Sequence, residues 1–69
     1  MKVEFAWSSW PNQVIFAVNL DAPPAVGDFV QIQGIAPAGG YVRPGRRWLF
    51  DEENGTHVVR CWLQNEPPR

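Results

Sequence analysis

Apolar and polar residues alternate along most of this chain, in short runs separated by Gly, Pro, Asn and Asp. Alternation with a period of two is typical of β-strands, because successive side chains of a strand point to opposite faces. The pattern predicts five strands, at residues 2–7, 13–20, 29–35, 47–51 and 56–63. No stretch long enough for a helix repeats its apolar residues at helical spacing without an internal Gly or Pro, so we expect no substantial helix.

The segments between the predicted strands also contain recognisable turn and loop signals. Two consecutive prolines make residues 21–25 a stiff connector, and Asn54-Gly55 closes a hairpin between the last two predicted strands. Residues 36–46 contain three glycines and two prolines and form the longest irregular stretch, in which Tyr41–Val42 could add a short strand. Five short strands in up-and-down order predict an all-β, antiparallel, partly open small barrel, since curling hides exposed sheet edges.

The segment Val26-Gly27-Asp28-Phe29-Val30-Gln31-Ile32, followed by a Trp-bearing strand and a hairpin, resembles the small SH3-like barrels common in bacterial and phage proteins. The resemblance covers about residues 26–63 and implies a fold, not a function. An OB-like barrel shares the same pattern, so strand order stays open. We expect one domain at residues 1–66 and a disordered tail at residues 67–69.

Composition narrows the function classes. The net charge is −1 and the pI about 5.6, unlike a general polyanion binder. Cys61 and His57 are the only residues of their types, so no disulfide can form within the chain and a structural zinc site lacks ligands. A lone thiol fits a reducing compartment, and we expect a cytoplasmic location. No apolar run has the length of a membrane span or the form of a signal peptide, so no membrane association is expected.

Candidate catalytic groups are sparse. His57 and Cys61 lie four residues apart on one predicted strand, a separation of about 13 Å, so they cannot act as a base and its nucleophile. The acidic residues 51–53 sit in a turn without the ligand spacing of a calcium loop. We therefore expect a protein with no catalytic residues, no metal, no cofactor and no small-molecule substrate.

A protein-binding surface is the leading prediction. If Val59, Cys61 and Leu63 fill the barrel, the alternate residues of the same strand lie outside, and Trp10 is hard to bury in its turn. Trp and Arg are enriched at binding hot spots. The predicted contact residues are Trp10, Val58, Arg60 and Trp62, and the partner is another protein or a second copy of the chain. In the competing interpretation, the tryptophans cap the open ends of the barrel.

The alternative function is binding of single-stranded nucleic acid or RNA by the loop that precedes Trp48. Arginines contact phosphates and aromatic rings stack on unpaired bases. The candidate residues are Tyr41, Arg43, Arg46 and Arg47. In the competing structural interpretation, these arginines solubilise the loop and pair with the acidic residues 51–53, and Trp48 lies in the core. With near-neutral net charge, any affinity for nucleic acid should be modest and sensitive to salt.

Overall fold

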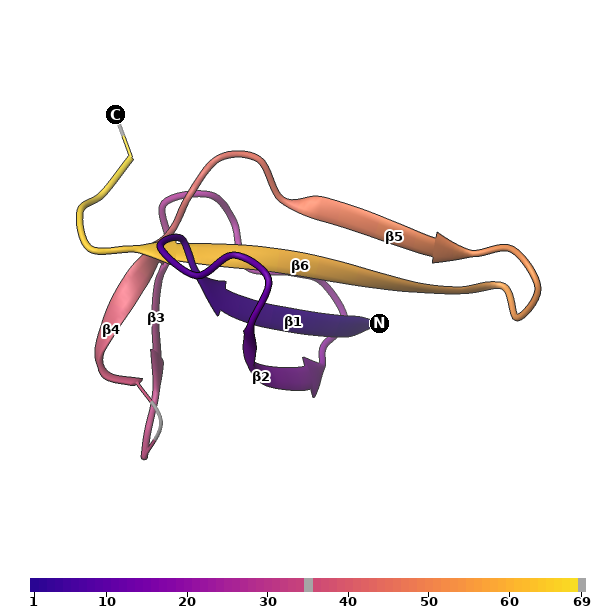
Figure 1. The fold of residues 1–69 in the computed structure, drawn as a ribbon, viewed down its shortest axis with the longest axis horizontal. Helices are drawn as coiled ribbons and strands as arrows, with labels where there is room; N and C mark the ends of the chain where they lie inside the picture. The colour runs from indigo at the N-terminus through magenta and orange to yellow at the C-terminus, as the bar shows by residue number, and fades with distance from the viewer. Residues whose placement is uncertain (35, 69) are drawn as a thin grey trace.

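The computed structural model describes residues 1–34 and 36–68, and these residues form six strands and no helix (Figure 1). The strands are β1 (Lys2–Trp7), β2 (Val14–Asn19), β3 (Phe29–Ile32), β4 (Ala36–Val42), β5 (Arg47–Asp51) and β6 (Thr56–Gln64). The all-β prediction is confirmed. Within the described residues, no helix is long and apolar enough to span a membrane.

The strand between residues 36 and 42 is the main departure from the expected element list. β4 occupies most of a segment that the glycines and prolines marked as irregular, and Tyr41–Val42 forms only its last part. The preceding strand, β3, ends at Ile32, before Gly34 takes a positive φ of 82°. Ile35, the predicted end of that strand, and Arg69 of the predicted tail lie outside the described residues.

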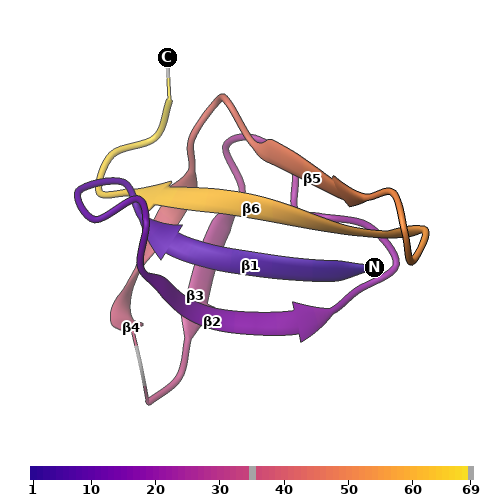
Figure 2. The ribbon, with the colours of Figure 1, turned by 45° about the vertical axis from the view of Figure 1, so that its right-hand side comes forward.

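The strands form one curled sheet in the order β2-β1-β6-β4-β3, with β5 paired to β6 beside this path, and the sheet makes a half-barrel (Figure 2). β1 pairs with β6 in parallel, from Lys2↔Val58 to Trp7↔Leu63. The prediction of a purely antiparallel, up-and-down order was therefore wrong. Period-two alternation fixes which face of a strand is apolar, but it contains nothing about which distant strand will lie beside it or in which direction.

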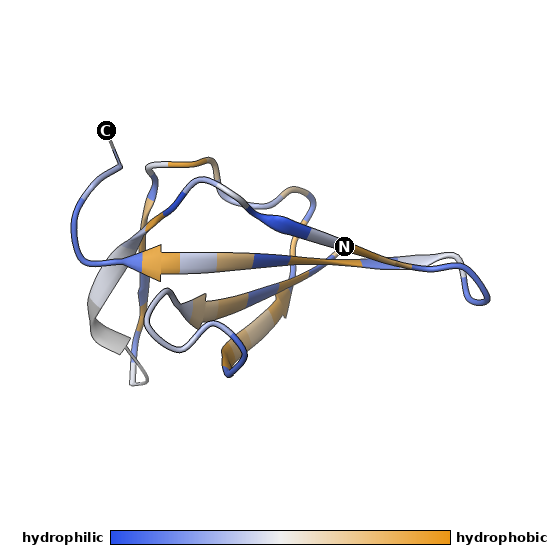
Figure 3. Cartoon of the chain, turned by 45° about the horizontal axis from the view of Figure 1, so that its top comes forward, coloured by the Kyte–Doolittle hydropathy of each residue, from blue (hydrophilic) through white to orange (hydrophobic). Residues whose placement is uncertain are grey.

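β6 is the strand that organises the sheet. β1 covers one edge of it, while its other edge is shared by β5 at residues 56–60 and by β4 at residues 63–64. β5 and residues 56–60 of β6 form a two-stranded arm, and its outer end, at residues 56–57, extends past β1 to the hairpin turn (Figure 1). Hydrophilic residues gather at that turn, and hydrophobic residues lie toward the other end of β6 (Figure 3).

The core lies on the inner face of the half-barrel. The predicted inward face of the last strand is confirmed, because Val59, Cys61 and Leu63 are all buried. They pack with Val3, Phe5, Ile32 and Val42. β4 can lie close to Leu63 and Trp7 because Gly40 has no side chain. A Cβ at this position would lie 2.9 Å from Leu63 Cβ and 3.0 Å from the Trp7 ring.

Candidate protein-binding surface

The β5–β6 arm carries an exposed aromatic cluster formed by Trp48, Phe50 and His57. The Trp48 and Phe50 ring centroids lie 6.4 Å apart, and those of Phe50 and His57 lie 5.9 Å apart. Phe50 is 74% exposed and Trp48 is 44% exposed. Such large apolar side chains are normally buried, so their gathering at the surface makes this cluster a candidate interaction site.

The register explains why these three rings meet. Residues directly opposite each other in an antiparallel pair share a face, and Trp48 lies opposite Val59 while Phe50 lies opposite His57. Val59 is completely buried in the core. The cluster is therefore the outward continuation of the core face, from the position of Val59 toward the hairpin turn.

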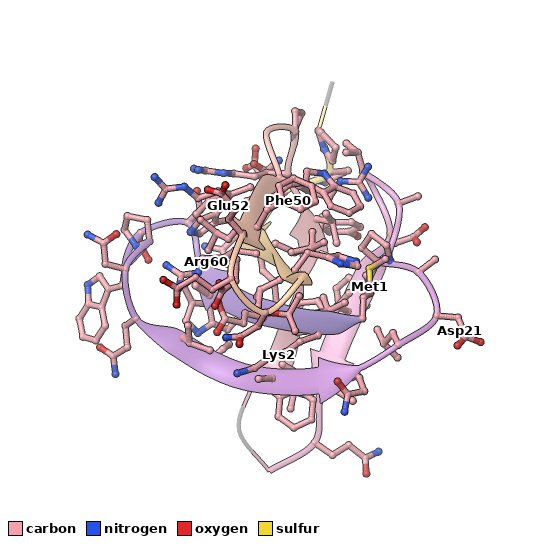
Figure 4. All side chains as sticks on the ribbon, turned by 90° about the vertical axis from the view of Figure 1, so that its right-hand side faces the viewer. Met1, Lys2, Asp21, Phe50, Glu52 and Arg60 are labelled. Carbon is pink, nitrogen blue, oxygen red and sulfur yellow. The ribbon has the colours of Figure 1, made fainter. Side chains whose placement is uncertain are left out.

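The second face of the arm has a different composition. It carries Leu49 opposite Val58, with Arg47 opposite Arg60 and Asp51 opposite Thr56. In the view toward the tip of the arm, Phe50 and Arg60 lie on different sides of the ribbon (Figure 4). Leu49 is 39% exposed, so both faces of β5 present apolar surface.

The outer edge of β5 is open. Among the described residues, β5 is paired only with β6, and all five of its residues are exposed. Natural sheets usually protect such an edge with charged side chains (lysine above all), proline or a bulge. β5 carries charges only at its two ends, Arg47 and Asp51; it contains no proline, and its register with β6 is unbroken. Its backbone groups can therefore accept an additional strand.

A shallow groove of about 550 Å³ adjoins the arm and extends from the N-terminus to the hairpin turn. It is formed by the N-terminal residues, the end of β2 and the start of β6. Its lining residues are Met1, Lys2, Asn19, Gly55, Thr56, His57 and Val58. His57 belongs both to this groove and to the aromatic cluster, so the two features form one continuous surface.

Trp62 does not belong to this surface. Its side chain was expected to lie outside the barrel, but the residue is only 7% exposed. Its indole Nε1 donates a hydrogen bond to the Pro11 carbonyl oxygen at 2.8 Å, and the Arg43 guanidinium lies 4.8 Å from its ring centroid. The turn after β1 folds over the outer face of β6 and covers the ring. Local alternation could not predict this long-range contact.

The other predicted contact residues have different surroundings. Trp10 is 67% exposed, as its position in a turn indicated. Arg60 is engaged within the sheet: its Nε and Nη2 donate to Glu4 Oε1 at 3.2 and 3.0 Å. Val58 is half-buried between Lys2 and Leu49. The structure therefore does not assemble Trp10, Val58, Arg60 and Trp62 into one exposed stripe.

The residues of the predicted nucleic-acid loop are also separated by their contacts. Tyr41 packs edge-on against Phe29 at 5.0 Å, and Arg43 Nη1 donates to Ser8 Oγ at 2.8 Å. Arg46 Nη1 donates to the Pro24 carbonyl oxygen at 2.8 Å. Arg47 is exposed and, in the described part of the chain, has no side-chain hydrogen bond or ion pair.

Two parts of the competing interpretation of that loop are contradicted, namely the ion pairs with the acidic turn and the core position of Trp48. Within residues 1–34 and 36–68, the only ion pairs join Glu4 to Lys2 and to Arg60, so the loop arginines do not pair with the acidic turn. Trp48 was assigned to the core there, and it is exposed instead. Trp48 lies on the same face as the buried Val59, but its side chain remains 44% exposed.

Cys61 is a core residue, as predicted. Burial raises the pKa of its thiol, with Arg46 acting weakly in the opposite direction, so the thiolate form is disfavoured at neutral pH. His57 contacts the rings of Trp48 and Phe50 on the arm. No cluster of three or more metal-binding side chains occurs among the described residues.

Comparison of the chain with protein-family models, with curated proteins and with solved structures finds no match. The candidate site therefore depends on its own geometry. The sequence did contain one signal for it: Trp48 and Phe50 are two apart on a predicted strand, so they share a face, and His57 opens the strand across the hairpin.

Proposed function

We propose that this chain is a non-catalytic protein-binding module that contacts its partner through the β5–β6 arm. The proposal keeps the function class expected from the sequence and moves the contact surface from Trp62 and Arg60 to the aromatic cluster. The observation that carries it is the 74% exposure of Phe50 beside Trp48 and His57, on a strand with an open edge. An SH3-like relationship and a cytoplasmic location remain parts of this proposal.

Two properties of the cluster support this function. Aromatic side chains supply large contact area with few rotatable bonds, so little entropy is lost when a partner orders them. An open strand edge supplies backbone hydrogen bonds at the same place. The arm therefore offers a partner both side-chain contact area and main-chain hydrogen bonds.

The test compares matched variants on one immobilised chain. We expect Phe50→Ser and Trp48→Ser to lose specific partners that the wild type captures from a lysate of the source organism. Trp10→Ser removes a similarly exposed ring from a distant turn and should keep them. Circular dichroism and thermal unfolding check that all variants are folded. Loss with Trp10→Ser alone, or capture unaffected by all three changes, would contradict the proposed surface.

Binding of single-stranded nucleic acid remains a second candidate because of one observation. Arg47, which has no side-chain partner among the described residues, and the exposed Trp48 are neighbours on β5 but project to opposite faces, so a single strand that crosses the open edge of β5 could stack a base on the ring and bring a phosphate to the arginine. Saturable quenching of tryptophan fluorescence by short oligonucleotides, weakened by salt and by Arg47→Glu, would favour this function. A flat titration at low salt would exclude it.

A further inference from the structure

The sequence of the open strand β5 is self-complementary. It reads Arg47-Trp48-Leu49-Phe50-Asp51, with opposite charges at its ends, two aromatic residues inside them and a leucine at the centre. Antiparallel pairing of two such strands about Leu49 places Arg47 opposite Asp51 of the second copy. It also places each Trp48 opposite a Phe50 and Leu49 opposite itself.

We infer that two copies of this chain associate through their β5 edges, in antiparallel register about Leu49. This inference deepens the proposed function by naming a second copy as a partner. The two half-barrel sheets would become one continuous sheet, in a symmetric interface that uses the same patch on both chains. Alternate residues of an edge strand direct their N–H and C=O groups outward, so the pairing satisfies backbone groups that water now solvates.

The side chains favour this register on both faces. On one face, Trp48 and Phe50 of each copy would form a continuous row of four aromatic rings, and cross-strand aromatic pairs stabilise sheets. On the other face, the two leucines would meet at the symmetry axis, with an Arg–Asp pair on each side. A shift of the register by two residues would remove these Arg–Asp pairs and place Leu49 opposite a charged residue, either Arg47 or Asp51 of the second copy.

Charge surroundings within one copy support the same pairing. Arg47 lies opposite Arg60, and Arg60 is already held by Glu4, so Arg47 has a like-charged neighbour and, among the described residues, no acidic partner. Asp51 already accepts hydrogen bonds from Glu53 N, Asn54 N and Asn54 Nδ2. A carboxylate has about four acceptor positions, so Asp51 can still accept one from Arg47 of the second copy.

The experiment uses the position that meets itself. Sedimentation velocity over a concentration series should show the wild type moving from 7.8 kDa toward twice that mass. Leu49→Lys and Leu49→Glu each place two like charges on the symmetry axis, and each variant alone should remain monomeric. An equimolar mixture of the two should recover association, because lysine then meets glutamate. Recovery would also show that both variants are folded.

Trp10→Lys is the matched control, since it puts the same charge at an exposed apolar residue away from β5, and it should associate as the wild type does. The inference is overturned if the wild type stays monomeric at about 1 mM, if either Leu49 variant associates like the wild type, or if the mixture stays monomeric. Loss of association with Trp10→Lys would also overturn it. A monomeric wild type that still captures a partner through Phe50 would leave the proposed function standing, which separates the two failures.

Discussion

At the scale of single residues, the two ion pairs of Glu4 should contribute differently to stability, because their partners are shielded from water to different degrees. Glu4 accepts two hydrogen bonds from Arg60 across the parallel β1–β6 pair, and both side chains are mostly buried. Glu4 also forms an ion pair with Lys2, whose Nζ lies 4.0 Å from Glu4 Oε2. The Lys2 side chain is 53% exposed. Shielded charges lose more when a partner is removed, because the remaining group stays desolvated.

Glu4→Gln should therefore lower the free energy of unfolding by about 1–2 kcal/mol, as expected for a partly buried hydrogen-bonded charge. Lys2→Gln is the matched control and should change it by less than about 0.5 kcal/mol, the usual effect of an exposed ion pair. Urea unfolding followed by tryptophan fluorescence measures both values. Equal losses in the two variants would mean that the Glu4–Arg60 contact stabilises the fold no more than the exposed Lys2–Glu4 pair does.

Trp62 provides a second prediction at this scale. Trp62→Phe keeps a large ring but removes the indole N–H that donates to Pro11, so we expect a loss of about 1–3 kcal/mol from the unpaired carbonyl and the smaller ring. Trp10→Phe should change stability by less than about 0.5 kcal/mol, since surface substitutions rarely cost more. Thermal unfolding distinguishes them. A Trp62→Phe variant that unfolds at the same temperature as the wild type would contradict the buried, hydrogen-bonded position of Trp62.

At the scale of elements, the β5–β6 arm depends on its turn. Asp51 ends β5 and accepts hydrogen bonds from Glu53 N at 3.0 Å and Asn54 N at 3.3 Å. Gly55 takes a positive φ of 65° there, and its N–H donates to the Asp51 carbonyl oxygen. Residues that favour turns thus fix the end of the hairpin through their own side chains.

Acid should loosen this turn selectively. Hydrogen bonds from Asn54, and more weakly from Glu53, hold the pKa of Asp51 below its ordinary value of 3.8. The carboxylate therefore stabilises the folded turn above that value, and the contribution is lost as the pH falls through the lowered pKa. In an NMR titration, the amide signals of Glu53 and Asn54 should shift below pH 3.8. Asp51→Asn should remove this titration, and its persistence would implicate another carboxyl group.

At the scale of the whole molecule, protection from water is uneven. β1 is paired on both edges and contains the buried residues Val3, Phe5 and Ala6, whereas β5 is paired on one edge and all its residues are exposed. Regions with few buried apolar contacts open at lower free energy, so β5 should open more readily than β1. The arm is therefore more available than β1 for rearrangement on binding.

Hydrogen exchange should report this difference. Under dilute conditions that keep the chain monomeric, the amides of β1 should exchange at least about 100-fold more slowly than those of β5, since opening of the body requires loss of core packing. Mass spectrometry of peptides from residues 2–7 and 47–51 measures both rates. Comparable rates would show that arm and body unfold as one unit.

The sequence predicted local features well and contacts between distant segments of the chain poorly. Alternation located five of the six strands and identified Val59, Cys61 and Leu63 as the core face of the last one. It missed β4, because glycine and proline are read locally as breakers, whereas Gly40 is needed to let β4 approach Leu63 and Trp7. It also assigned Trp62 to the surface, since the turn that covers this ring comes from residues far away in the chain.

The sequence by itself determined the all-β class, the faces of the strands and the hairpin turn, because these follow from the alternation of side chains and from local turn chemistry. Only the tertiary structure decided the parallel β1–β6 pair and the division of the β6 edge between β4 and β5. The same packing left Trp48 and Phe50 beyond the core and Trp62 beneath a turn. Strand partners and burial depend on which distant segments meet, and a period of two along one strand carries no information about that.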